Sequence, residues 1–301
     1  MTNYTVIITS YKEPDLVSEC IESVILSNKS IINQMQLLVV CGDQTTYNCA
    51  NTTLTKNQNN FSNYTVLKDN AKGKSQALNL AFKKAKGNIW IMTDGDVYLE
   101  KDAVTNLIKP FQDKKTIATT GQIKSLEKKD NFFGYYSHVF TDAANFYRHN
   151  KQQTNNAFFP LSGYLYAIYK QNNLVLPKGL KAEDDYISHL IYKPEYNFKY
   201  VSTAIVNVRF PKNLNDLIRQ KVRSLGGNVQ NKKFFPTNNR SIFQDLKMFL
   251  FPITYANNLK QFVFSLLIYP LRLYLWFVIY YQHMTNNYKD GAWDIIESSK
   301  R

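Results

Sequence analysis

Short apolar runs alternate with helix-like segments through the first 125 residues, and this alternation limits the fold more than any other feature of the sequence. The runs predicted as strands are 4–11, 35–40, 64–67, 88–92 and 116–123, and the segments predicted as helices are 13–28, 75–86 and 102–112. The Asn- and Thr-rich stretch 44–63 is predicted as loop or weak helix. Strands that alternate with helices form a mostly parallel sheet that is covered on both faces. We therefore predict an α/β fold.

Polar side chains follow the first four predicted strands at their carboxyl ends. These groups are Ser10-Tyr11-Lys12-Glu13, Gly42-Asp43, Lys68-Asp69 and Asp94-Gly95-Asp96. Open α/β sheets bind ligands outside the carboxyl ends of their strands. The sequence therefore predicts a binding site at this edge, with carboxylates from several strands.

The second part of the chain is less regular. We predict an aromatic surface helix at 132–147, a strand at 157–169 broken at Ser162-Gly163, a helix from 182 through 191, a strand-rich region at 196–210, and a basic helix at 214–225 that ends at Gly226-Gly227. With no internal repeat or low-complexity linker, one domain with an extension is preferred. Its predicted parts are a catalytic domain at 1–240, divided into a nucleotide-binding half (1–125) and an acceptor half (126–240), and a membrane-associated helical extension at 241–301.

The extension contains a 20-residue apolar run, 262–281, in which Arg272 is the one charged side chain. Twenty residues can just span a bilayer, but an Arg near the bilayer centre costs at least ~2.5 kcal/mol. A narrow polar stripe runs along the segment: Ser265, Tyr269, Arg272, Trp276, Tyr280 and His283. The stripe is expected to face the protein while the rest meets lipid. Whether the segment spans the bilayer or lies in its interface stays open, and a core helix or a dimer interface is the alternative.

Charge is distributed unevenly along the chain. Lys and Arg number 37 against 23 Asp and Glu, and 26 of these basic and 13 of these acidic side chains lie after residue 110. Such an excess suits phosphate, an acidic membrane surface or nucleic acid, or is simply a solvated basic face.

Three cysteines cannot form a closed disulfide set, which favours a reducing compartment. No signal peptide is expected at the N-terminus.

Asp94-Gly95-Asp96 is the first candidate site for chemistry. Two carboxylates at i and i+2 after a strand can share one Mg²⁺ or Mn²⁺ ion, since these hard cations prefer oxygen ligands and nucleotide phosphates. The same triplet is also a common turn.

Glu183-Asp184-Asp185 is the second candidate. Adjacent carboxylates raise one another's proton affinity, which suits a general base near neutral pH; the alternative is capping and dipole complementation at a helix start. Gln220 and Arg223 share one face of the basic helix, where an Arg can bind a pyrophosphate or simply face solvent.

Several other chemistries find no support. Gly73-Lys74-Ser75 is not a P-loop, because the Gly required five residues earlier is replaced by Lys68. Lys74 can still steer a phosphate, or only begin its helix. The histidines show no metal-ligand spacing, and HExxH, CxxC and GxSxG patterns are absent from the sequence.

Taken in order, these pieces resemble an inverting family 2 glycosyltransferase with the GT-A fold. The matching elements are 9–14, Gly42-Asp43, 73–79, Asp94-Gly95-Asp96, Ser162-Gly163, Glu183-Asp184 and Gln220-xx-Arg223. The resemblance covers about residues 4–230. Gln-xx-Arg with a hydrophobic C-terminus is most similar to the membrane-associated branch, which includes hyaluronan- and cellulose-synthase-like enzymes.

The resemblance implies roles for individual residues. The nucleotide-sugar is expected to contact Ser10, Tyr11, Glu13, Asp43, Lys74, Asp94, Gln220 and Arg223. The metal, Mg²⁺ or Mn²⁺, is expected on Asp96 with Asp94. Asp184 is the expected general base with Glu183 beside it, and Ser162 and Gly163 are expected to bind the acceptor.

One departure from the family pattern narrows the expected activity. Ser224 stands where the related pattern has Trp after the Arg, and long multi-span regions are missing, so a processive synthase is not expected. Transfer of one sugar to a hydroxyl of a membrane-held or lipid-linked glycan fits better, with the catalytic domain cytoplasmic and no nucleic acid bound. The alternatives are transfer to a polyprenyl phosphate, and a non-catalytic basic protein that binds membrane or nucleic acid.

Overall fold

The computed structural model describes residues 3–28, 30–59, 61, 63–153, 158–235, 249–284 and 297–299. The strands are β1 (Tyr4–Ser10), β2 (Met35–Cys41), β3 (Tyr64–Lys68), β4 (Ile89–Asp94), β5 (Val97–Leu99), β6 (Thr116–Ser125), β7 (Leu165–Tyr169) and β8 (Asn197–Val208). The α-helices are α1 (Pro14–Ser27), α2 (Gln44–Lys56), α3 (Lys74–Phe82), α4 (Ala103–Ile108), α5 (Phe132–Gln152), α6 (Glu183–Ile191), α7 (Leu214–Asn231), α9 (Phe251–Tyr255) and α10 (Leu259–Met284).

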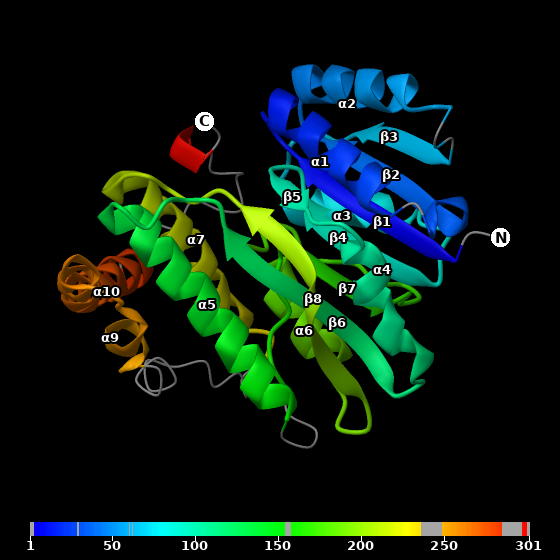
Figure 1. The fold of residues 1–301 in the computed structure, drawn as a ribbon. Helices are drawn as coiled ribbons and strands as arrows, with labels where there is room; N and C mark the ends of the chain where they lie inside the picture. The colour runs from blue at the N-terminus through cyan, green and yellow to red at the C-terminus, as the bar shows by residue number, and fades with distance from the viewer. Residues whose placement is uncertain are drawn as a thin grey trace.

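The strands form one eight-stranded sheet in the order β3-β2-β1-β4-β7-β6-β8-β5 (Figure 1). The first four strands of this order are parallel to one another. β7 runs antiparallel between β4 and β6, β6 is parallel to β8, and β5 is antiparallel to β8. The predicted α/β fold is confirmed, and the sheet is parallel in its N-terminal part and mixed beyond β4.

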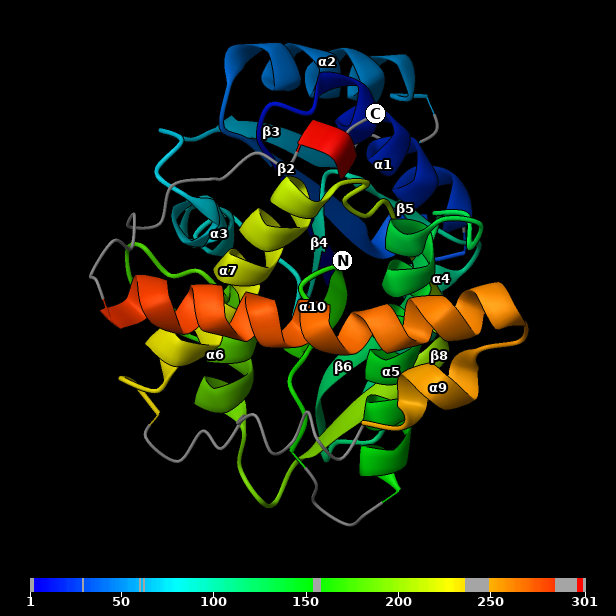
Figure 2. The same ribbon diagram turned by 90° about the vertical axis from the view of Figure 1, so that its left-hand side faces the viewer.

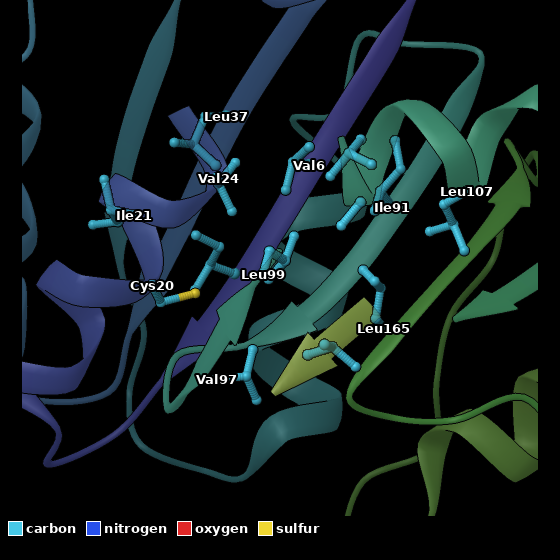
Figure 3. Packing of buried hydrophobic residues seen from close by; sticks show 14 of the residues in the cluster. Val6, Cys20, Ile21, Val24, Leu37, Ile91, Val97, Leu99, Leu107 and Leu165 are labelled. Atoms are coloured by element: carbon cyan, nitrogen blue, oxygen red, sulfur yellow. The ribbon is translucent and has the colours of Figure 1, made fainter. Parts of the chain in front are cut away.

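Helices cover both faces of this sheet. Along β1, Val6 and Ile8 belong to the cluster that packs under α1, α2 and α4, whereas Ile7 belongs to the cluster that contains α3 and α6. Side chains of a strand alternate between faces, so an apolar run such as this is buried on both sides. Figure 3 shows the first cluster, where Cys20 lies among aliphatic side chains of the helix and strands.

A third cluster joins the C-terminal helix to the rest of the protein. Ile268 of α10 is buried with Tyr135 and Val139 of α5 and Leu217 of α7. α10 lies across α5 and α7, with α9 beside it (Figure 2). The predicted boundary at residue 240 lies outside the described residues, and the helices of the extension pack on the predicted catalytic domain.

α10 also has the composition of a membrane helix. Leu259–Tyr281 is the one helix among the described residues that is long and apolar enough to cross a membrane, with a mean hydropathy of 1.9. This property follows from the length and composition of the helix alone.

Three local predictions differ from the structure. Within 44–63, residues 44–56 form the regular helix α2, because Asp43 caps it by accepting from the Thr46 amide at 2.9 Å. The strand predicted at 157–169 begins only at Leu165, after a turn in which the Leu165 amide donates to the Ser162 carbonyl. α7 continues to residue 231 instead of ending at 226–227.

Gly227 explains why α7 continues. A Cβ at this position would lie 2.5 Å from the Ala182 Cβ and 2.8 Å from its amide nitrogen. The glycine therefore lets α7 approach the start of α6, instead of ending the helix.

Gly227→Ala is expected to lower the free energy of unfolding by about 1–3 kcal/mol, because the added methyl overpacks the contact with Ala182. In a helix without this contact, the same change would stabilise the helix by about 1 kcal/mol. The sign of the change in the free energy of unfolding therefore shows whether α7 packs closely on Ala182. Urea denaturation followed by circular dichroism measures it, with the exposed Ser224→Ala on the same helix as the control. A more stable Gly227→Ala variant would show that α7 does not approach Ala182 this closely.

Candidate active site

The carboxyl end of β4 packs directly against the end of β1. Gly95 makes this possible, since a Cβ there would lie 2.5 Å from both Cβ and Oγ of Ser10. The Gly95 amide also donates to the Thr9 carbonyl at 2.9 Å. Asp94 and Asp96 are therefore held at the edge of the sheet where the parallel strands end, both half-buried.

Lys74 lies at the centre of the site. Its ammonium is 2.6 Å from Asp94 Oδ1 and 2.9 Å from Glu183 Oε1. Burial favours the neutral amine, but the two carboxylates hold the pKa of Lys74 well above its usual value. Lys74 begins α3 directly after Gly73, whose φ of 97° favours glycine. The ion pairs therefore join the consecutive elements α3 and β4 to α6, which lies about 100 residues further along the chain.

Asp184 is held by the turn before β7. The Gly163 amide donates to Asp184 Oδ2 at 2.7 Å, and a Cβ on Gly163 would lie 3.1 Å from that oxygen. Burial and the adjacent Glu183 carboxylate raise the pKa of Asp184 to about 6, while Lys74 opposes the shift. This carboxylate can therefore gain and lose a proton near neutral pH.

Ser162 and Gly163, predicted to bind an acceptor, lie next to Asp184. Ser162 is buried, and its amide donates to Thr120 Oγ1 at 3.0 Å. Gly163 contacts Asp184 itself. Gly163 thus orients the Asp184 carboxylate, and Ser162 lies in the turn beside it.

Asp185 has surroundings quite different from those of Asp184. It is buried, accepts from Asn231 Nδ2 at 2.9 Å, and lies 3.7 Å from His189 Nε2. Asn231 also donates to the Ala182 carbonyl at 3.1 Å. Asp185 therefore joins α6 to the last turn of α7. Sequence reasoning did not identify Asn231, because the pairing depends on tertiary contacts.

The predicted nucleotide residues gather beside the end of β1. Ser10 Oγ donates to Glu13 Oε2 at 2.9 Å. Asp43 accepts from the Lys12 amide at 2.6 Å and from the Thr46 amide. Although burial opposes it, these amide bonds lower the pKa of Asp43. Lys12 has a left-handed φ of 56°, so the loop is held in a conformation uncommon for a side chain other than glycine.

Tyr11 lies half-buried in the same loop. The Lys12 ammonium is 5.4 Å from the centre of its ring, within the range of a cation–π contact. An aromatic ring at a strand end offers a flat surface for a base or sugar.

Gln220 and Arg223 approach the site from α7. Arg223 is exposed in the structure. The protein around the guanidinium excludes part of its water and so opposes the charge, but Glu183, Asp94 and Asp96 raise the pKa of Arg223, so the guanidinium lies in the field of these carboxylates. Gln220 is half-buried one turn earlier.

Two tyrosines that sequence reasoning missed border the site. Burial and the nearby Asp96 raise the pKa of Tyr164, while Arg223 lowers it. Burial also holds the pKa of Tyr166 well above its usual value, with Lys74 opposing and Asp184 adding to the shift. Both phenols thus lie in the field of these charged groups. Tyr166 lies in β7 and Tyr164 directly before it, and the apolar sequence around them gave no local signal that they border a site.

The donor set fits a divalent ion only when a ligand completes it. Among the described residues, no group of three or more His, Cys, Asp or Glu side chains could hold a metal. Mg²⁺ commonly binds through one or two carboxylates plus substrate phosphates. Asp94 and Asp96 supply such hard oxygens from the end of β4, and Asp94 also lies 2.6 Å from the Lys74 ammonium.

Comparison with known proteins identifies the family. Residues 5–170 match the model of Glycosyl transferase family 2, which is more than half of the chain. The chain belongs to this family. The poly-beta-1,6-N-acetyl-D-glucosamine synthase of Staphylococcus aureus (strain MSSA476) is 24% identical over 278 residues, which cover 90% of this chain and 64% of that protein. This chain thus spans less than two thirds of its relative.

Solved structures confirm the GT-A fold. The mannosyltransferase PcManGT from Pyrobaculum calidifontis, in complex with GDP-Man and Mn²⁺, has a TM-score of 0.58 at 19% identity and covers 77% of this chain and 64% of that one. S. aureus TarS 1–349 in complex with UDP-GlcNAc has a TM-score of 0.51 at 14% identity, covering 87% and 79%. The predicted family and fold are confirmed.

The ion pairs of Lys74 predict two opposite pKa changes. Lys74→Gln is expected to raise the pKa of Asp184, because the ammonium lowers it, and Glu183→Gln is expected to lower that pKa, because the neighbouring carboxylate raises it. Carbon-13 NMR of protein labelled at the aspartate carboxyl carbons measures both, with Asp184→Asn assigning the signal. Lys72→Gln, which removes an exposed charge, is the control. If both variants shifted the pKa of Asp184 in the same direction, the placement of Lys74 and Glu183 beside Asp184 would be contradicted.

Proposed function

We propose that the chain is an inverting glycosyltransferase that moves a sugar from a nucleotide-diphosphate sugar to a hydroxyl of a membrane-held or lipid-linked glycan. The observation that carries this proposal is Asp184, a carboxylate with a pKa of about 6 that is fixed by the Gly163 amide beside the cationic Lys74. A base, a cation and strand-end carboxylates at one edge suit displacement at a sugar carbon that carries a diphosphate.

The donor is proposed from the site and from the relatives. PcManGT is described with GDP-Man and TarS with UDP-GlcNAc. In this chain, the loop Ser10–Glu13 and Asp43 are proposed to hold the nucleoside, with Arg223 and Gln220 gripping the diphosphate. Arg is suited to this, because its planar donors match phosphate oxygens.

A divalent ion, Mg²⁺ or Mn²⁺, is proposed on Asp96 with Asp94. When bound, it would supply positive charge against the leaving diphosphate. PcManGT is described with Mn²⁺.

The proposed reaction is a single displacement. Asp184 accepts the proton of the acceptor hydroxyl, while the Gly163 amide fixes the orientation of this carboxylate through Oδ2. The hydroxyl oxygen forms a bond to the anomeric carbon, and the bond from that carbon to the diphosphate oxygen breaks with its electron pair. The configuration inverts, and Arg223 stabilises the charge of the departing nucleoside diphosphate.

The acceptor and the location are proposed from the C-terminal helices and the relative. The S. aureus relative is a polysaccharide synthase, which supports a glycan acceptor, and α10 supports membrane association. The catalytic domain is proposed on the cytoplasmic side, a reducing compartment that suits the free cysteines. Ser224, where the related pattern has Trp, favours transfer of one sugar over processive synthesis. The membrane-associated branch of the family is proposed on the same grounds.

Asp184→Asn tests the base. The amide keeps the size of the carboxyl group but cannot take the proton, so transfer from UDP-GlcNAc or GDP-mannose to a membrane extract is expected to fall by ~10²-fold or more, with donor binding retained. The wild-type rate is expected to fall as the pH drops through about 6, where Asp184 becomes protonated. Undiminished transfer by Asp184→Asn would favour a polyprenyl phosphate acceptor, which is already anionic and needs no base.

Asp185→Asn is the matched control for that experiment. Because Asp185 bonds to Asn231, its loss is expected to destabilise the protein more than to change chemistry. If a folded Asp185→Asn variant lost transfer and Asp184→Asn kept it, the assignment of Asp184 as the base would be wrong.

Asp96→Ala tests the metal. It is expected to abolish Mn²⁺-dependent binding of the nucleotide sugar, because the variant lacks the carboxylate that is proposed to hold the ion. Calorimetric titration of UDP-GlcNAc or GDP-mannose with and without Mn²⁺ measures this. Full binding and transfer in EDTA would contradict metal dependence.

A further inference from the structure

α10 has one face packed on the protein and one face left open. Its buried side chains are Ser265, Ile268, Leu275 and Ile279. Ser265 Oγ lies 2.8 Å from Tyr135 Oη of α5, which anchors the helix to the domain. The predicted polar stripe is only partly on this face: Tyr269, Arg272 and Trp276 are half-buried and Tyr280 is exposed, while the side chain of His283 lies outside the described ones.

The open face is strongly apolar. Of the 22 exposed large hydrophobic side chains among the described residues, 13 lie between 249 and 284. Those on one line of α10 are Leu259, Leu266, Leu273, Phe277 and Met284. A continuous apolar surface of this kind marks a protein or membrane contact.

Charge selects between these two partners. The described residues around this face, 249–284, contain Lys260 and Arg272 but no Asp or Glu. A second copy of this chain, with a net charge of +14, would bring like charges together at this face. An anionic lipid surface is complementary in both charge and apolarity.

Packing also determines how the helix meets lipid. Directly beside α10, Tyr255 of α9 donates to Asp142 of α5 and accepts from Lys129 at 2.7 Å. If α10 crossed a bilayer, these charged groups would enter hydrocarbon at high cost. Pro270 has no N–H for the Leu266 carbonyl, and at a membrane surface water or headgroups can satisfy that oxygen.

We infer that α10 lies flat in the interface of an anionic membrane, with the Leu273–Phe277 side toward the acyl chains, and that it does not span the bilayer. The carboxyl ends of β1 and β4 point toward the side of the molecule that carries α7 and α10 (Figures 1 and 2). The candidate active site therefore faces the same side as the membrane. An acceptor held by a lipid reaches Asp184 from that surface, a point that rests on the proposed function.

Depth-dependent quenching tests the orientation in the full chain. A fluorophore is attached at Leu259→Cys, Leu273→Cys or Met284→Cys in a Cys49→Ser background, since Cys20 and Cys41 are buried. Vesicles of phosphatidylcholine with phosphatidylglycerol carry quenchers at shallow or deep positions. A flat helix of roughly 39 Å gives the same shallow depth at all three positions. Val175→Cys, outside α9 and α10, is equally exposed and is expected to stay unquenched.

Two results would overturn the inference. A deep label at 273 with shallow labels at 259 and 284 would show a spanning helix. Unquenched labels together with a concentration-dependent dimer would assign the face to a second copy.

Vesicle flotation with Leu273→Glu/Phe277→Glu provides an independent variant test. Membrane-bound protein is expected to fall at least ~10-fold, with the matched Val175→Glu unchanged. Flotation should also weaken without phosphatidylglycerol. Flotation unchanged in the double variant would contradict the inference. UDP-GlcNAc or GDP-mannose binding, measured in parallel, separates the two proposals: failure of the wild type to bind either donor counts against the function and leaves the quenching result intact.

Discussion

The double ion pair of Lys74 is the interaction on which the rest of the site depends. Asp94, Glu183 and Asp184 are brought together by elements that begin or end at one sheet edge, and three carboxylates at such an edge repel one another. The ammonium between Asp94 and Glu183 offsets this repulsion at distances of 2.6 and 2.9 Å. It also keeps the pKa of Asp184 from rising further, so that the carboxylate can ionise near neutral pH.

A second set of contacts holds α7 against α6. Asn231 reaches Asp185, Gly227 meets Ala182, and the Lys181 amide donates to Gln230 at 3.0 Å. These contacts occur on the last two turns of α7 and leave its earlier turns, with Arg223, over the carboxylates. α10 packs on the same helix. One helix therefore contacts both the candidate active site and the apolar face.

The sequence predicts features that depend on neighbours along the chain. The first four strands and the acids that follow them were evident, since a strand buried on both faces is a continuous apolar run and its end is polar. The insertion of β7 between β4 and β6 was not evident, because strand order depends on pairing across distant segments. The same applies to Lys74, whose partner Glu183 lies more than 100 residues away.

Gly226-Gly227 and the polar stripe show how local signals mislead. A Gly pair usually ends a helix. At Gly227, however, the absence of a side chain allows α7 to contact Ala182, and this contact is evident only from the tertiary structure.

On α10, polarity alone suggested which face would be inward. The inward face shares Ser265 with that stripe and otherwise follows Ile268, Leu275 and Ile279, because α5 and α7 present mainly rings and aliphatic chains there. Hydropathy measures how apolar a helix is, whereas the neighbours of its two faces determine whether it crosses a membrane or lies on one. For α10, one of those neighbours is α7, which carries Arg223, so any lipid surface on its outer face lies one helix layer away from the site.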